Sequence, residues 1–148
     1  MKKLKVYLDN CCFNRPYDDQ TQVVIAVETK AKLFVQRLIT DDKIDLVWSF
    51  ISAYENNHNP YPDRREAIGR WQELAVQPIN KTDEIIILAR EIMQSGIKHK
   101  DALHLASAIS VKCDYFITVD DRLLKHKTDD ISILNPMQFI KEWSERND

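Results

Sequence analysis

The sequence predicts an α/β fold, in which helices cover both faces of a parallel sheet. Short apolar runs typical of strands alternate with longer segments whose apolar residues recur at helical spacing. Such alternation favours parallel strands joined by right-handed crossovers. The 148 residues, 44% hydrophobic and 30% charged, suit a single folded domain. We therefore expect one domain over residues 1–148.

The first half of the chain contains two of the expected strands. Residues 6–8 form a short apolar run that stops at Asp9, and a polar loop follows over 14–20. Apolar residues from Val23 to Leu38 predict a helix, and residues 46–48 predict a second strand. A short helix over 52–57 ends before Pro60 and Pro62, and a further helix is expected over 64–74.

The second half continues the alternation. A helix over 85–93 is opened by Thr82 or Asp83 and closed by Gly96. Another helix runs over 100–111, followed by a strand over 115–117 that leads to Asp120. A short helix over 121–127 and a strand over 131–134 come next. The final helix begins at Asn135 and Pro136 and buries an apolar face.

Composition restricts the function classes. The formal net charge of -2 argues against a general nucleic-acid-binding surface, so any such binding needs a local basic patch or metal ions. Cys11, Cys12 and Cys113 lack the spacing of a zinc site and read as free thiols. The N-terminus enters a strand at once, and no apolar run reaches membrane-spanning length. We expect a cytoplasmic protein without membrane contact.

Four acidic residues need a chemical explanation. Asp9, Glu55 and Asp120 follow strands, so they belong to the rim where parallel sheets bind ligands. Asp101 begins an apolar helix stripe, where a carboxylate needs a partner. Helix capping would also account for Asp101 or Asp120, and a solvated helix for Glu55. Together, the four favour a hydrolytic site, because clustered carboxylates repel one another without a divalent metal ion.

Four stretches that contain these acids resemble the PIN domain, the metal-dependent ribonuclease fold of many VapC-type bacterial toxins. They appear in the order and spacing of that family and span nearly the whole chain: VYLD at 6–9, SFISAYE at 49–55, KDALHLASA at 100–108 and YFITVD at 115–120. The resemblance implies a three-layer fold. Its mainly parallel sheet would have four to five strands, with helices on both faces.

The resemblance also implies the chemistry. Asp9, Glu55, Asp101 and Asp120 would act as catalytic residues and bind Mg²⁺ or Mn²⁺, whose hard-oxygen preference they match. Thr118 would support the site. Asn10 can orient a metal-bound water, whereas the next position, usually polar in the family, is Cys11 here. The expected activity is hydrolysis of RNA by a toxin, with an antitoxin protein as partner and a possible homodimer.

Basic residues near the acids are candidate contacts for RNA phosphates. Two groups flank Asp101 and Asp120 in the sequence, and one arginine follows Asp9: Lys98, Lys100, Arg122, Lys125 and Arg15. An ordinary solvated charged surface would explain the same residues. His104, within the helix that Asp101 begins, could support the site through one of the acids, but we expect a surface or packed histidine.

Two other functions remain open. A PIN-like domain without cleavage activity would bind RNA or protein; the four acids argue against it and the Asn10-Cys11 pair argues for it. A phospho-acceptor signalling domain also places acids at strand ends. That class needs an aspartate pair near the first strand and a lysine ending a late strand, and this chain has neither.

Overall fold

The computed structural model describes residues 3–147, which form an all-parallel five-stranded sheet in the order β3-β2-β1-β4-β5. The strands are β1 (Lys5–Leu8), β2 (Asp45–Ser49), β3 (Gln77–Ile79), β4 (Tyr115–Ile117) and β5 (Ser132–Leu134). β1 is central and pairs with β2 and β4. The predicted α/β class and parallel sheet are confirmed.

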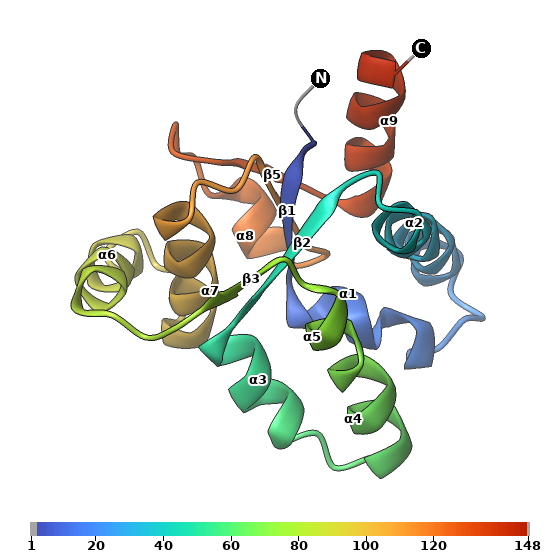
Figure 1. Ribbon diagram of the computed structural model, residues 1–148, viewed down its shortest axis with the longest axis horizontal. Coiled ribbons are helices and arrows are strands. Elements are labelled where there is room, and N and C mark those ends of the chain that lie inside the picture. Colours follow the sequence, from blue (N-terminus) through green and yellow to red (C-terminus); the bar gives the residue numbers. More distant parts are fainter. Residues whose placement is uncertain (1–2, 148) are drawn as a thin grey trace.

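Helices cover both faces of this sheet, as the alternating sequence pattern predicts (Figure 1). On one face lie α6 (Asp83–Met93) and α7 (His99–Ser110), and on the other lie α2 (Val23–Thr40) and α9 (Pro136–Asn147). The shorter helices are α1 (Asn10–Asn14), the 3-10 helix η1 (Arg15–Tyr17), α3 (Phe50–Asn57), α4 (Pro62–Gly69), α5 (Trp71–Leu74) and α8 (Asp121–Lys125).

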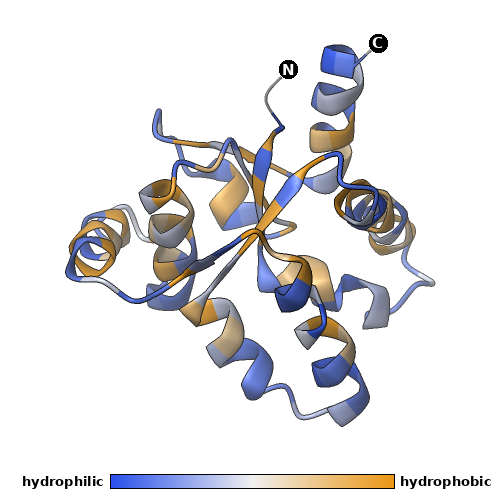
Figure 2. Ribbon diagram, in the orientation of Figure 1, coloured by the Kyte–Doolittle hydropathy of each residue, from blue (hydrophilic) through white to orange (hydrophobic). Residues whose placement is uncertain are grey.

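Two apolar clusters separate the three layers. One packs Tyr7, Val47 and Phe116 against α6 and α7, and the other packs alternate strand residues such as Val6 and Leu46 against α2 and α9. Side chains of a strand alternate between faces, so each short strand contributes to both clusters. Figure 2 shows the result, since most helices carry a hydrophobic and a hydrophilic side. Within residues 3–147, every helix is too short or too polar to span a lipid bilayer.

Three local features differ from the sequence-based expectation. The edge strand β3 was not among the strands expected from the pattern, because it is short and contains Pro78, which a strand tolerates only at an edge or bulge. The single helix expected over 64–74 is two helices, α4 and α5, that meet at Arg70. The helix α1 precedes the polar loop expected over 14–20, and the first part of that loop is the 3-10 helix η1.

The helix α2 is present as expected, but its buried face is more polar than its apolar spacing suggests. Val23 and Val27 are 76% and 41% exposed, whereas Glu28 and Lys32 are buried. The first turns of α2 pack on η1, where Glu28 lies 3.5 Å from Arg15 and Thr29 donates to the Arg15 carbonyl. A tertiary contact between polar groups therefore sets which side of this helix faces inward.

Candidate active site

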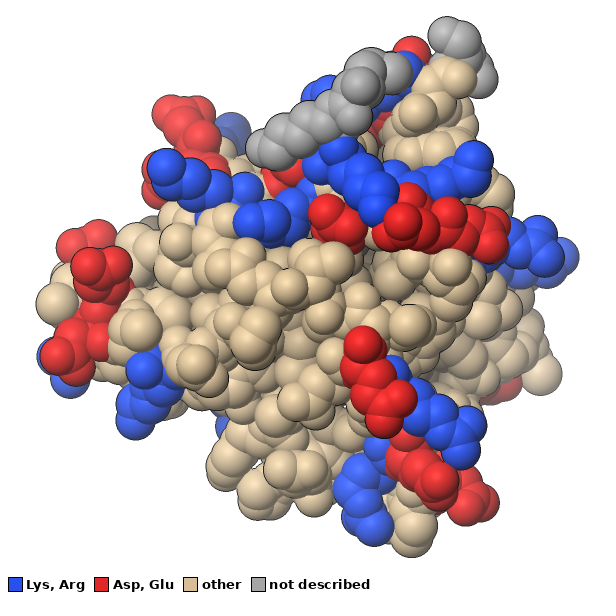
Figure 3. Space-filling view, in the orientation of Figure 1, with Lys and Arg blue, Asp and Glu red and all other residues tan. Residues whose placement is uncertain are grey.

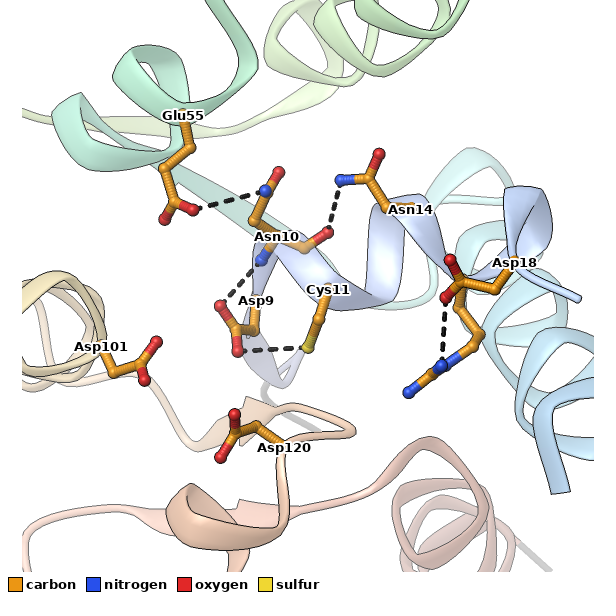
Figure 4. A pocket seen from close by; sticks show the side chains of 9 residues that line it. Asp9, Asn10, Cys11, Asn14, Asp18, Glu55, Asp101 and Asp120 are labelled. Atoms are coloured by element: carbon orange, nitrogen blue, oxygen red, sulfur yellow. Dashed lines mark hydrogen bonds and ion pairs between the residues drawn. The ribbon is translucent and has the colours of Figure 1, made fainter. Parts of the chain in front are cut away.

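Four acids from different parts of the sequence line one cavity of about 350 Å³ at the carboxyl ends of the strands (Figure 4). Asp9 directly follows β1, Glu55 lies on α3 after β2, and Asp120 follows β4. Asp101, which strand ends alone do not place, reaches the same cavity from the first turn of α7. The remaining lining residues are Asn10, Cys11, Asn14, Arg15 and Asp18.

Asp9 is the most enclosed of the four acids and is held by several donors. It is 4% exposed and caps α1 by accepting from the Asn10 backbone N–H at 2.8 Å. The Thr118 hydroxyl donates to Asp9 Oδ2 at 2.8 Å, and the Cys11 thiol donates to the same oxygen at 3.3 Å. The carboxylate is therefore fixed in one orientation by groups from α1, which follows β1, and from Thr118, which follows β4.

Cys11 occupies the position where the sequence departs from the family pattern. The neighbouring Cys12 thiol, burial and the Asp9 carboxylate raise the pKa of Cys11 well above its usual value. Cys11 thus stays a thiol, which donates to Asp9 and lies 3.4 Å from the Thr118 hydroxyl. A weak thiol donor supports the first acid here.

Asp120 combines a structural contact with a place in the cavity. Its Oδ1 accepts from the backbone N–H groups of Arg122 and Leu123 at 2.9 and 3.1 Å, so it is the N-cap of α8. Its own backbone N–H donates to Thr118 Oγ1 at 3.0 Å. Thr118 consequently links Asp9 and Asp120, the two acids at the ends of neighbouring strands.

Glu55 is anchored by a buried hydrogen-bond chain through His104, the supporting role that the sequence did not favour for this histidine. His104 is fully buried and bonds Glu55 through Nε2 and the Tyr7 hydroxyl through Nδ1. Tyr7 also contacts the hydroxyls of Ser49 and Ser52, at 2.5 and 3.1 Å. His104 is therefore a buried histidine and not a surface one. Its ring nitrogens contact polar groups, and through them it connects Glu55 of the cavity to Tyr7 in the core.

The electrostatics of His104 follow from the same contacts. Burial alone would lower the pKa of His104, but the bond to Glu55 and the charges of Asp9 and Asp101 outweigh it and raise this pKa.

The sequence does contain a signal for this role of His104. The residue lies in a buried helix stripe, between Ala102 and Ala106, where a polar side chain needs a partner.

Asp101 differs from the other three acids because its carboxylate has no hydrogen bond or ion pair within residues 3–147. Burial and the charges of Asp9 and Asp120 raise the pKa of Asp101 to about 6. Figure 4 shows the carboxylates of Asp101 and Asp120 pointing toward each other. Such mutual repulsion of carboxylates is relieved by a bound cation.

The donor set suits Mg²⁺ or Mn²⁺, although the acids do not converge closely. Among the described residues, no three His, Cys, Asp or Glu side chains form a ready-made metal cluster. Mg²⁺ keeps several of its waters and binds through one or two carboxylates, so an open cavity lined by separated acids fits this ion better than a tight cage would.

The basic residues predicted to hold phosphates divide into two groups. Lys98, Lys100, Arg122 and Lys125 are exposed, and within residues 3–147 none of them forms an ion pair; Lys100 lies 5.4 Å from the Tyr54 ring centre. Arg15 lines the cavity, but it pairs with Asp18 at 3.0 Å and with Glu28 at 3.5 Å. Much of its charge is already neutralised.

The fold and the site define a parallel α/β domain with four acids around a cavity at its carboxyl rim, and the comparisons with known proteins name the family. The sequence matches the PIN domain over residues 6–128, so the chain belongs to the PIN domain family. Members of this family are generally nucleases and use divalent metal ions. No curated protein matches the sequence.

The fold has a counterpart among solved structures. The chain is similar to VapBC2 from Rickettsia felis bound to a DNA fragment from their promoter, with a TM-score of 0.56 and 12% sequence identity. The match covers 89% of this chain and 98% of that one. At this identity the likeness concerns the fold, and it agrees with the VapC-like resemblance of the sequence.

Proposed function

We propose that this protein is a Mg²⁺- or Mn²⁺-dependent endoribonuclease that acts as the toxin of a toxin–antitoxin pair. The observation that supports the catalytic part is the gathering of Asp9, Glu55, Asp101 and Asp120 around one cavity in a PIN domain. The toxin role is supported by the likeness to a VapBC complex. A cognate antitoxin is the partner this role requires.

The side chains that line the acidic cavity would have different roles in the proposed hydrolysis. Asp9 is fixed by Thr118 and Cys11, and Glu55 by His104, so both would present oxygens in set directions. Asp101 from α7 and Asp120 from the end of β4 would supply further oxygens to the same cavity. A divalent ion held there supplies an activated water and positive charge beside the scissile phosphate. Asn10, which donates to Glu55 at 3.4 Å, keeps a free amide oxygen for orienting that water.

RNA recognition in this proposal is local. Figure 3 shows positive and negative side chains intermixed along the upper edge and at the lower right of one face, without a broad basic surface. Exposed Lys98 and Lys100 beside Asp101, and Arg122 and Lys125 after Asp120, would contact phosphates on either side of the acids.

The decisive experiment is cleavage of a panel of structured and single-stranded RNAs by purified protein with Mn²⁺, with Mg²⁺ and with EDTA. Asp9→Asn and Asp101→Asn proteins serve as site variants, and Asp129→Asn, an exposed acid before β5, serves as the matched control. We expect metal-dependent cuts with the wild type and the control, and a loss of at least roughly 100-fold in both site variants.

The outcomes separate the candidate functions. Cleavage that survives both site variants would reject the assignment of the acids. Absence of cleavage from folded protein, free of antitoxin and tested on the whole panel, would favour the RNA- or protein-binding module. That alternative has one structural argument, because a thiol replaces a polar group beside Asp9.

A further inference from the structure

A second polar cavity opens beside the acidic one. It has a volume of about 310 Å³ and shares Asn10, Asn14, Asp18 and Glu55 with the acidic cavity. The rest of its wall comes from the turn between α3 and α4 and from the start of α4. We call it the α3–α4 pocket.

Arg64 supplies the positive charge of the α3–α4 pocket. Its guanidinium lies 4.0 Å from the Tyr61 ring centre and 4.7 Å from the Tyr17 ring centre. These two cation–π contacts hold the guanidinium between the rings and use none of its N–H groups as hydrogen-bond donors to carboxylates. Within residues 3–147, Arg64 has no ion-pair or hydrogen-bond partner, and it is only partly exposed.

The two carboxylates of the α3–α4 pocket are already engaged. Asp18 pairs with Arg15 at 3.0 Å, and Glu55 bonds His104. Arg64 is therefore the arginine of this pocket whose charge is not balanced by a neighbour. An anion entering beside the acids would find its charge complement there.

Amide groups connect Arg64 to the acidic cavity. Asn10 donates to Glu55 at 3.4 Å, Asn14 donates to the Asn10 carbonyl at 3.1 Å, and Asn59 donates to the Asn14 side chain at 3.4 Å. Asn59 in turn accepts from the Tyr61 backbone at 3.1 Å. Figure 4 shows Asn10 and Asn14 side by side along this wall. Amides with spare donors and acceptors suit the edges of an unstacked base.

We propose that the α3–α4 pocket binds the nucleotide of a single-stranded RNA next to the one whose phosphate is cut, with Arg64 holding the phosphate of that nucleotide. The inference rests on the proposed function, because it extends the same cavity along the same strand. Guanidinium contacts to phosphate and stacking of bases on tyrosine are the usual means of single-strand recognition.

The test measures RNA binding without cleavage. The probe is a fluorescein-labelled, mixed-sequence 12-nucleotide single-stranded RNA, and its Kd is measured by anisotropy in EDTA over a series of salt concentrations. We expect Arg64→Gln to weaken binding by roughly tenfold and to reduce the salt slope by about 0.7, the value of one phosphate contact on a single strand.

Matched variants guard against a trivial loss of folding. Arg70→Gln removes the same charge from the C-cap of α4, where the arginine is exposed and pairs with Glu66 at 3.2 Å, and should leave the Kd unchanged. Asn14→Asp keeps the oxygen that Asn59 contacts, removes the donor to the Asn10 carbonyl and adds a negative charge to the shared wall, so it should weaken binding too. Thermal unfolding is measured for every variant. If Arg64→Gln does not fold, the Kd of Asn14→Asp for the RNA tests the proposal.

The results distinguish failure of this proposal from failure of the proposed function. Binding that depends on Arg64 in a protein that never cuts RNA with Mn²⁺ supports the pocket and rejects the nuclease. RNA cleavage with wild-type KM and Kd in Arg64→Gln and Asn14→Asp supports the nuclease and overturns the pocket. Equal losses in Arg64→Gln and Arg70→Gln would also overturn it, because charge alone would then explain the effect.

Discussion

The carboxyl group of Asp101 stands apart at the residue scale, because its neighbours repel it and no donor within residues 3–147 holds it. Its pKa of about 6 in the fold lies above the value near 3.9 of an unfolded aspartate. Between these pH values the folded state binds more protons, so the wild-type protein loses stability as pH rises from about 4 to about 6.

Asp101→Asn should therefore stabilise the metal-free protein at pH 7.5. We expect a gain of about 1 kcal/mol in the free energy of unfolding, a reduced value because the half-exposed carboxylate is screened by water. The gain should vanish below about pH 4, where both forms are neutral. Urea unfolding in EDTA at both pH values measures it, with exposed Asp129→Asn as control; a gain that persists at low pH would contradict this explanation.

His104 illustrates how one buried polar group supports a site residue. His104→Leu removes the anchor of Glu55, while Tyr7 keeps its contacts to Ser49 and Ser52. We expect a loss of about 1–3 kcal/mol in stability and a lower kcat on any RNA the wild type cuts. His104→Gln, which can restore the contact to Glu55, should recover part of the activity. Exposed His99→Leu on the same helix should change neither quantity.

At the scale of elements, the helix α2 was predicted correctly from the helical spacing of its apolar residues. The same spacing did not predict which side of α2 faces the core. Lys32 on this helix is 4% exposed and forms no ion pair within residues 3–147. Burial lowers the pKa of Lys32 to about 8. The unfolded state then holds more protons between pH 8 and about 10.5, so stability rises with pH across this interval.

Replacing this ammonium by an apolar group should stabilise the protein. Lys32→Met keeps a long unbranched side chain, and we expect it to raise the free energy of unfolding by about 2 kcal/mol at pH 7. The gain should shrink between pH 8 and 10.5. Chemical denaturation across this interval tests it, against Lys30→Met on the exposed side of α2. A loss of stability in Lys32→Met would show that the contact of the ammonium with the Phe13 ring, 5.8 Å from the ring centre, outweighs the cost of its burial.

At the scale of the whole molecule, the acidic cavity joins elements from both halves of the chain, so a bound ion should stabilise the entire fold. An ion at 100 times its Kd adds about 2.7 kcal/mol to the free energy of unfolding. For a domain of this size, we expect the Tm to rise by roughly 5–10 °C with Mn²⁺. Differential scanning fluorimetry measures the shift.

The matched variant for this experiment is the double replacement Asp9→Asn/Asp101→Asn, which removes the charge of two of the four acids that line the cavity. It should fold and show a much smaller rise of Tm with Mn²⁺. An equal rise in the double variant would place the ion elsewhere on the protein, and the metal part of the proposed function would then fail.

The sequence by itself determined the alternation of helices with four of the five strands, the parallel sheet and three of the four acids at its rim. The position of these acids could be predicted because Asp9, Glu55 and Asp120 come after strands that run in the same direction. Residues that follow parallel strands lie at the same edge of the sheet. It also indicated the family through four short stretches, which the match over residues 6–128 supports. Local pattern was sufficient for these features because each depends on near neighbours in the chain.

Only the tertiary structure decided the position of Asp101 in the cavity, the inward face of α2 and the anchoring of Glu55 by His104. The short edge strand β3 also needed its neighbour, because Pro78 weakens any strand signal. The physical reason is common to all four. Each depends on a partner many residues away, such as Glu55 for His104, and no spacing within one segment encodes which distant group will satisfy a buried polar side chain.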